Sequence, residues 1–489
     1  MHEKSKFIDG SMSENNLIIS RFTKIHESWK EITDRVSSIV TNSADINKFI
    51  LGGSFIPAGQ ILRGGGFKDK ILYNSFVTSI DKGEREKEIA TRITNWTKLG
   101  PGVGVNVSDW IRCRENESGK QLRIIAEAIC NSQQSLWEKG ITRTATMINV
   151  DFDIVGIEEL ALEISLKKEF RHINLGVLVT NEVLEKAQIV GSSENKKLKA
   201  ICKSIWASGN PGLIFIDNVN KHHPFKGEKI NACNSCAEQF LLPNEGCCLG
   251  AINLSMFVVE GKIDFQRLNN CVTESIVFLD NVIDASSFPC FESKTLALNR
   301  RRIGLGIMGL DTMFEKLGVD YSSKEAIDLC LEISKLFKEF SISSSEELAK
   351  KSMSFPDFNK SSLKQPRRNS YLNSIAPTGA ISMIFQNSSG IEPTFANKIV
   401  KGDIIVSLRR QGNNTKTVYE VSPESQIDVL SIWQGNIDGG ISKTLNLTED
   451  KTYNHIFAAV ILAWIKGCKG LSIFRHNSRK SSFTISSNQ

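Results

Sequence analysis

The chain has 489 residues, of which 40% are hydrophobic, so it is long enough to bury a large core. Its 60 basic and 54 acidic residues leave a formal net charge of +6, spread along the chain without a long block of one sign. This mild excess is typical of a protein that binds anionic small molecules and gives no indication of nucleic-acid binding.

The hydropathy pattern gives no indication of a membrane protein. No apolar run reaches the roughly 18–20 residues that span a bilayer. The longest candidate, His455–Ile465, stops at Lys466 and predicts a buried helix. The N-terminus is polar and lacks the apolar core of a signal peptide. We therefore expect a cytoplasmic protein without a membrane partner.

The predicted elements begin with helical periodicity around Arg21–Val40, which indicates a short helical segment over residues 1–50. From Leu51 the sequence changes to short apolar runs punctuated by glycines. Strand-like segments then alternate with amphipathic stretches of helical length. The clearest of these strands are 173–180, 213–217 and 250–259. Such alternation predicts an α/β barrel or a wound sheet.

The remaining segments complete the expected organisation. Residues 321–353 carry apolar side chains at helical spacing and predict one or two long surface helices. Residues 402–450 are the least patterned part of the chain. We expect one large unit over residues 51–480, followed by a disordered polar tail at 481–489.

Eleven cysteines are present, an odd number without the pattern of a disulfide scaffold. Four of them fall within sixteen residues: Cys233, Cys236, Cys247 and Cys248. The first two form a C-x-x-C, which leaves a zinc site as one interpretation. Adjacent cysteines are poorly spaced for tetrahedral coordination, however, so no metal site is predicted.

Asn234 and Glu238 flank Cys236 at two residues on either side. By spacing alone such a trio is a common coincidence. The longer window at 234–255, NSCAEQFLLPNEGCCLGAINLS, resembles the active-site finger loop of ribonucleotide reductases, above all that of the adenosylcobalamin-dependent (class II) group.

The resemblance continues in order over about residues 51–480 and implies a ten-stranded α/β barrel of the ribonucleotide reductase and glycyl-radical type, with a central finger loop. About fifty residues precede this barrel, so no ATP-sensing regulatory domain is expected. The matching segments are FIPAGQIL at 55–62, GPGVGVNVS at 100–108, TRTATMINVD at 142–151, INLGVLVT at 173–180, GNPGLIFIDNVN at 209–220, RRIGLGIMGL at 301–310 and APTGAISMIFQNSSGIEP at 376–393.

The resemblance implies reduction of ribonucleotide di- or triphosphates to 2′-deoxyribonucleotides. Cys236 would form a transient thiyl radical that abstracts the ribose 3′ hydrogen. Glu238 would act as general base on the 3′ hydroxyl, and Asn234 would hydrogen-bond the neighbouring hydroxyl. A carboxylate can take the proton without being consumed, and a closed barrel shields a radical from water.

A helix start is predicted at residues 377–382, where free N–H groups and the positive end of the helix dipole favour a phosphate. An ordinary N-cap is the other interpretation; the resemblance matches this stretch to the loop that holds the substrate phosphates. Glycines near residue 103 are expected to let the backbone approach the nucleotide. The expected substrate-binding residues are Asn74, Ser75, Gly102, Gly104, Pro377, Thr378, Gly379, Ala380, Ile381 and Ser382.

The sequence departs from the family in its redox cysteines. The family uses two further cysteines that reduce the substrate and close to a disulfide; Cys247 matches one, but Ser75 stands where the other is expected. A hydroxyl cannot form a disulfide. Three outcomes stay open: an external reductant such as formate, a thiol or a thioredoxin-like protein; pairing of Cys247 with Cys233 or Cys248; or altered chemistry.

Two departures concern the C-terminal part. No cysteine follows Cys468, so the C-x-x-C tail that re-reduces family members is not found, in agreement with a changed electron source. The segment at 471–479 has Phe474 and Arg475 where partner-driven enzymes carry a tyrosine pair. Phenylalanine cannot serve as a tyrosine relay, so we predict adenosylcobalamin as the radical source.

Further expectations concern regulation and alternatives. A site for a deoxynucleotide effector is one interpretation of Ser79–Arg92, where Asp81 resembles an effector-site residue; a solvated helix start is the other interpretation. A monomer or a homodimer is expected. The alternative functions are a radical nucleotide-modifying enzyme that does not use the dithiol and a non-catalytic nucleotide-binding homologue.

Overall fold

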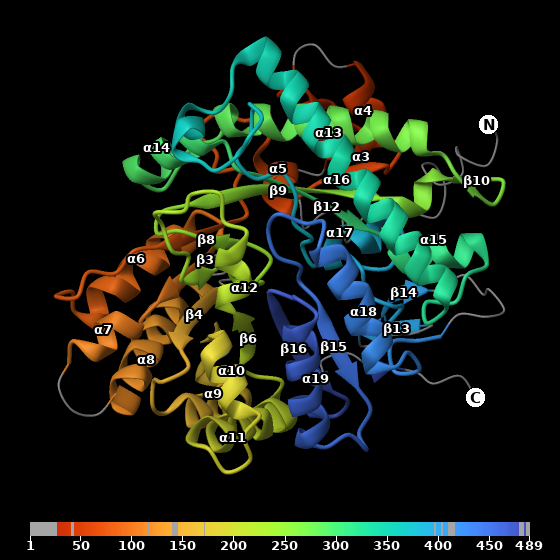
Figure 1. The fold of residues 1–489 in the computed structure, drawn as a ribbon. Coiled ribbons are helices and arrows are strands. Elements are labelled where there is room, and N and C mark those ends of the chain that lie inside the picture. Colours follow the sequence, from red (N-terminus) through yellow and green to blue (C-terminus); the bar gives the residue numbers. More distant parts are fainter. Residues whose placement is uncertain are drawn as a thin grey trace.

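A computed structural model shows a central sheet with helices around its outer side (Figure 1). The described residues are 27–40, 44–114, 118–138, 145–170, 172–395, 398–401, 404–408, 416–478 and 484–485.

The first half of the sheet consists of five strands, each parallel to the next. Their apolar residues are buried almost throughout, as expected for parallel strands covered on both faces. The strands are β2 (Ser75–Thr78), β3 (Gly102–Asn106), β4 (Thr146–Asp151), β5 (Ile173–Val179) and β6 (Gly212–Phe215). The helices between them are α6 (Glu86–Lys98), α7 (Ser108–Arg112), α8 (Ser118–Glu138), α9 (Ile157–Leu166), α10 (Asn181–Ala187) and α11 (Ser193–Ser208).

The second half repeats the parallel arrangement. Its named strands are β9 (Gly246–Asn253), β12 (Ile303–Met308), β15 (Thr444–Leu447) and β16 (Gly470–Arg475). β12 runs parallel to β9, and β15 runs parallel to β16. The two halves meet through antiparallel pairs, β2 with β9 and β6 with β16. The short β1 (Phe55–Pro57) pairs with β9 beyond the end of β2.

A short extended segment, residues 371–375, closes the ring between β12 and the residues that precede β15. It forms parallel bridges from Asn373 to Leu305 and from Ile375 to Ile441. The amide of Ile375 donates to the carbonyl of Gly440 at 3.1 Å. Five strands from the first half, with four strands and this segment from the second, make ten. The prediction of a ten-stranded α/β barrel is therefore confirmed.

The outer helices of the second half cover β9, β12 and β15 (Figure 1). They are α13 (Phe265–Ala285), α14 (Phe291–Arg300), α15 (Leu310–Leu317), α16 (Lys324–Ser352), α18 (Pro423–Gln434) and α19 (Tyr453–Ile465). The predicted long helix near residues 321–353 is α16, and the predicted buried helix is α19, which buries one face. Among the described residues, no helix combines the length and the apolar character needed to cross a membrane.

The predicted N-terminal helical segment is represented by α3 (Trp29–Ser37) and α4 (Ala44–Leu51). Ser28 and Glu31 form a capping box at the start of α3. Trp29 attaches the segment to the barrel unit, with its ring against that of Phe385 at a centroid distance of 5.6 Å. The first part of the predicted helix, before residue 27, lies outside the described residues.

Two residues of the predicted C-terminal tail, Thr484 and Ile485, are described by the structure. These residues form β17, which pairs with β13 (Lys398–Lys401), itself paired with β14 (Ile404–Leu408). β-branched residues favour strands, and the edge of β13 offers unpaired backbone groups. The rest of 481–489 lies outside the described residues.

The ring closure generates a stability prediction. A Cβ at Gly306 on β12 would lie 2.3 Å from the carbonyl oxygen of Ser374. We expect Gly306→Ala to lower the free energy of unfolding by about 1–3 kcal/mol, the usual cost of overpacking, as measured by urea denaturation. Gly83→Ala is the control, because nothing lies within 4 Å of that position. Equal stability of the two variants would contradict the described closure.

Candidate active site

A hairpin enters the barrel between the two halves. Its stem is formed by β7 (Ala232–Cys233) and β8 (Phe240–Leu241), which pair antiparallel, and its tip consists of residues 234–239. Within the tip, the amide of Asn234 donates to the carbonyl of Gln239 at 2.9 Å. Ala237 has a φ of 60°, which turns the chain back. This hairpin is the predicted finger loop.

The tip brings the three predicted catalytic residues together. The Nδ2 of Asn234 donates to Oε1 of Glu238 at 2.8 Å and to Oγ of Ser75 at 3.2 Å. Asn234 and Glu238 are buried, whereas Cys236 between them is exposed. The thiol is therefore presented outward on a loop whose flanking polar side chains are held by hydrogen bonds.

Glu238 has the protonation behaviour of a general base. Burial raises the pKa of its carboxyl to about 7, and the hydrogen bond from Asn234 opposes only part of this effect. Its Oε2 has no hydrogen-bond partner. A carboxylate with a pKa near neutrality and a free oxygen can accept a proton from a substrate hydroxyl at physiological pH.

Ser75 lies directly opposite Cys247 in the antiparallel pair of β2 and β9. Cys247 is 1% exposed, and burial raises the pKa of its thiol well above the usual value. Asn74 donates its backbone N–H to the carbonyl of Cys247 at 3.3 Å. The serine therefore occupies the cross-strand position from which a second thiol would face Cys247.

The two other cysteines considered as partners are engaged elsewhere. The thiol of Cys248 donates to the carbonyl of Leu279 on α13 at 3.5 Å, on the outer side of β9. The thiol of Cys233 donates to Oδ1 of Asn149 at 3.2 Å. Adjacent residues of a strand face opposite sides, so Cys248 points away from Cys247. Within the described part of the chain, no group of three or more His, Cys, Asp or Glu side chains is placed to hold a metal ion.

The glycines of β3 make room for the finger loop. A Cβ at Gly104 would lie 1.9 Å from the carbonyl oxygen of Cys233, and one at Gly102 would lie 2.4 Å from Oγ of Ser235. The close backbone approach predicted for these glycines is therefore made by the loop itself. Contact of either glycine with a nucleotide stays a prediction.

The predicted helix start at 377–382 is found as α17 (Gly379–Ile384). Its N-cap residue Thr378 has a φ of 53°, and its hydroxyl accepts from the amide of Gly390 at 2.8 Å. The preceding Ala376 packs against the small cluster of Ala58, Cys247 and Leu249, which places this turn near Cys247.

The six residues of this stretch differ in exposure. Pro377 is exposed, Gly379 and Ala380 are half-buried, and Thr378 is buried. Ile381 belongs to the main core, and Oγ of Ser382 lies 2.9 Å from Oγ of Ser389. The side chain of Ile381 is thus not free for a ligand, and phosphate binding by the stretch stays a prediction.

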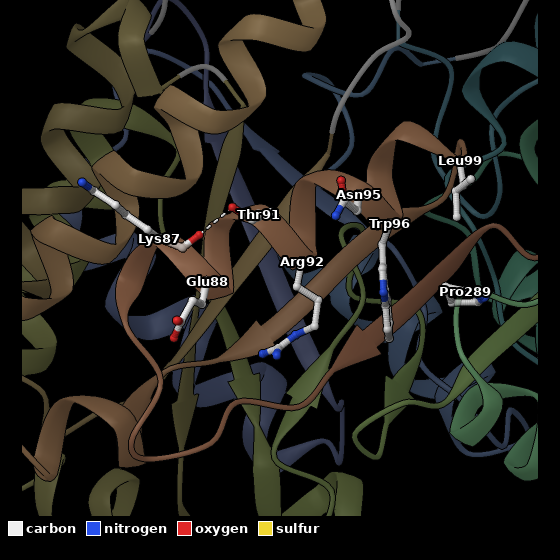
Figure 2. A pocket seen from close by; sticks show the side chains of 8 residues that line it. All are labelled: Lys87, Glu88, Thr91, Arg92, Asn95, Trp96, Leu99 and Pro289. Carbon is white, nitrogen blue, oxygen red and sulfur yellow. Dashed lines mark hydrogen bonds between the residues drawn. The ribbon is translucent and has the colours of Figure 1, made fainter.

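Asp81 lies on an exposed turn before α6, where its amide donates to Oε2 of Glu84 at 2.8 Å. A hollow of about 540 Å³ lies along α6, with Arg92 and Trp96 projecting from the helix toward it (Figure 2). Asp81 is not among its lining residues, which are Lys87, Glu88, Thr91, Arg92, Asn95, Trp96, Leu99 and Pro289. The effector role of Asp81 stays a prediction.

Several residues that hold the loop were not singled out from the sequence. Gln239 donates from Nε2 to Oγ of Ser374 on the closing segment. The amide of Gly440 donates to the carbonyl of Glu238 at 2.8 Å, and Arg302 donates to the carbonyl of Phe240 at 2.7 Å. These contacts join residues far apart in sequence, and no local pattern marks them.

The chain matches the family model described as "Ribonucleotide reductase, barrel domain" over residues 87–367, 362–414 and 408–474. The chain belongs to the ribonucleotide reductase barrel-domain family. The finger loop, the two five-strand halves and their antiparallel joints are thus the features of a family member.

Two relatives of the chain are longer proteins. It is 30% identical over 544 aligned residues to the vitamin B12-dependent ribonucleoside-diphosphate reductase of Thermoplasma acidophilum, covering 96% of this chain and 69% of the relative. It is 31% identical over 368 residues to that of Mycobacterium tuberculosis strain CDC 1551, covering 64% of this chain and 53% of the relative. The match thus spans about half the length of the mycobacterial relative.

A solved structure supports the fold. The α subunit of the Actinobacillus ureae class Id ribonucleotide reductase superposes with a TM-score of 0.80, covering 96% of this chain and 98% of that chain at 18% sequence identity. The barrel reductase family and the barrel fold expected from the resemblance are therefore both confirmed.

The raised pKa of Glu238 predicts a pH-dependent gain of stability in Glu238→Gln. The folded protein binds this proton up to about pH 7, whereas the ordinary value is 4.5, so ionisation costs folding free energy progressively between these values. We expect the variant to gain on the order of 3 kcal/mol relative to wild type as pH rises from 4.5 to 8. Urea denaturation across this range measures the difference; a pH-independent difference would contradict the shift.

Proposed function

We propose that this protein reduces ribonucleotides to 2′-deoxyribonucleotides by thiyl-radical chemistry at Cys236. The observation that carries the proposal is the loop tip inside the barrel, where the exposed Cys236 lies between the hydrogen-bonded, buried pair of Asn234 and Glu238. Family membership and relatives named ribonucleoside-diphosphate reductases support it.

Each residue of the trio has a role suited to its chemistry. The sulfur of Cys236 exchanges a hydrogen atom with the ribose 3′ carbon. Glu238, with a pKa of about 7, takes the proton of the 3′ hydroxyl through its unpartnered Oε2. Asn234 donates hydrogen bonds that hold the carboxylate and, with substrate present, the neighbouring hydroxyl.

The electrons are proposed to come from outside the barrel. Replacing the 2′ hydroxyl by hydrogen releases water and requires two electrons and two protons. A dithiol supplies these by closing to a disulfide, but Ser75 opposite Cys247 has no sulfur. An external thiol, a thioredoxin-like protein that forms a disulfide with Cys247, or formate oxidised to carbon dioxide would complete the balance.

The radical source is proposed to be adenosylcobalamin, since relatives are named as vitamin B12-dependent. When bound, this group supplies an organic radical by homolysis of its cobalt–carbon bond. The exposed thiol of Cys236 fits a radical delivered from outside the loop. On β16, Phe474 and Arg475 provide no phenol, and Arg475 lies with its guanidinium 4.2 Å from the ring centre of Trp206.

A second candidate is favoured by Ser75 itself. With only one thiol in the cross-strand pair, the same hydrogen abstraction would lead to a modified nucleotide other than the 2′-deoxy product. A non-catalytic nucleotide-binding homologue has less support, because binding alone does not require Asn234, Cys236 and Glu238 together.

Turnover tests the proposal directly. Purified protein is incubated with adenosylcobalamin, each common ribonucleoside di- and triphosphate, and either a dithiol or formate. We expect a 2′-deoxynucleotide by liquid chromatography, with at least a 1,000-fold loss in Cys236→Ala, as is typical on removal of a covalent catalytic group (~10³ or more). Cys113→Ala, which changes an exposed cysteine outside the site, is the control. A different nucleotide product supports the second candidate, and no product together with no cob(II)alamin signal contradicts both.

Ser75→Cys tests the electron supply. Because position 75 lies opposite Cys247, we expect the new thiol to form a disulfide with Cys247 during turnover and to increase dithiol-dependent product formation. Peptide mass spectrometry after a single turnover detects the bond, and Ser75→Ala is the matched control without sulfur. Absence of the disulfide in a variant that turns over would contradict the assignment of position 75.

A further inference from the structure

Asn149 lies inside the barrel, in the middle of β4, and is fully buried. Most neighbours on this strand are apolar, so a buried amide needs hydrogen-bond partners to offset the loss of water. Its partners come chiefly from Cys233, in the stem of the finger loop, and from Val105 on β3. The side chain therefore links the barrel wall to the loop.

The amide of Asn149 serves both backbone groups of Cys233. Nδ2 donates to the carbonyl of Cys233 at 3.2 Å, and Oδ1 accepts from its backbone N–H at 3.4 Å and from its thiol at 3.2 Å. Nδ2 also lies 3.3 Å from the carbonyl of Val105. The side chain of Asn149 thus forms the hydrogen bonds that a neighbouring strand would otherwise form along the edge of β7 that faces away from β8.

The requirement for such a side chain follows from the stem itself. Cys233 is fully buried, and its backbone N–H and C=O point away from β8. Buried backbone groups without partners destabilise the fold, because they lose their hydrogen bonds to water without a replacement. The primary amide of asparagine offers a donor and an acceptor in the same plane, one for each backbone group of Cys233. An aliphatic residue at position 149 would leave both groups of Cys233 unpaired.

The surrounding wall holds the amide in its orientation. A Cβ at Gly176 on β5 would come within 3.2 Å of Oδ1 of Asn149. On the other side, the backbone of Gly104 lies so close to the carbonyl of Cys233 that a Cβ there would overlap it. The amide, the carbonyl and the two glycine backbones are therefore packed against one another.

We infer that Asn149 is a positioning residue that sets how the finger loop presents Cys236. Cys233 is three residues before Cys236 and immediately before Asn234, so a shift of its backbone moves the whole tip. Only the expected effect of Asn149 on turnover rests on the proposed function. The effect on the loop itself does not depend on the reaction.

The test compares Asn149→Leu with a matched variant, Asn446→Leu. Asn446 is also a buried asparagine on a barrel strand, β15, but its Nδ2 donates to the carbonyl of Thr444 on its own strand at 3.0 Å and not to the loop. Hydrogen–deuterium exchange of peptides covering residues 231–241 reports on the loop in the protein without substrate. We expect at least a tenfold faster exchange there in Asn149→Leu and an unchanged rate in Asn446→Leu.

Turnover provides a second readout. We expect kcat to fall at least tenfold in Asn149→Leu, because Cys236 is displaced together with Asn234 and Glu238, and KM to change by a smaller factor, because the other predicted substrate contacts lie outside the loop. If Asn149→Leu does not fold, Asn149→Ser takes its place, since serine is smaller and cannot reach both groups of Cys233.

The outcomes separate the inference from the proposed function. Unchanged exchange at 231–241 in a folded Asn149 variant, or equal acceleration in Asn446→Leu, would overturn the positioning role. If wild type shows no turnover but the exchange differs as expected, the proposed function fails while the role of Asn149 in holding the loop stands.

Discussion

The finger loop must fit inside a closed ring of strands, and the rest of the structure depends on this constraint. The strands that face the loop carry glycine where they contact it, because a larger side chain would overlap the loop. Gly104 borders the carbonyl of Cys233, and a Cβ at Gly304 on β12 would lie 2.6 Å from Nε2 of Gln239. Gly440 beside the closing segment likewise borders the carbonyls of Ala237 and Glu238. Both halves of the barrel therefore contact the loop, and the position of its tip depends on the contacts with both.

Burial of the loop also decides its electrostatics. Glu238 and Glu245 belong to the same hairpin region and are almost equally buried, at 2% and 3% exposure. Burial raises the pKa of both, but Glu245 lies near the guanidinium groups of Arg302 and Arg300, which lower its pKa below the ordinary value. Glu238 is opposed only by neutral donors, the amide of Asn234 and a backbone N–H, and has a pKa of about 7. The stem is thus anchored by ionised groups, while the tip keeps a carboxyl that can exchange a proton.

The sequence could predict much of this arrangement because the informative segments are contiguous. The strands, the helix start at α17 and the trio around Cys236 each lie within one short window. The closing segment at 371–375 could not be predicted, since it pairs through isolated bridges that only the finished ring defines. Asn149 was missed for a similar reason. The role of a single asparagine in a buried strand can be recognised only when the structure shows Cys233 beside it.

At position 75 a hydroxyl stands where the family resemblance predicts a thiol, and this separates two properties that a cysteine would combine. The hydroxyl still accepts a hydrogen bond from Asn234 at 3.2 Å, so the polar network of the tip is maintained. It cannot accept or release an electron pair through a disulfide, so Cys247 is left without a cross-strand redox partner. In the proposed reaction, hydrogen-atom and proton transfer would depend on the loop, whereas a redox disulfide would depend on the wall. Because these proposed functions would reside on different elements, the described geometry around Cys236 does not require a sulfur at position 75.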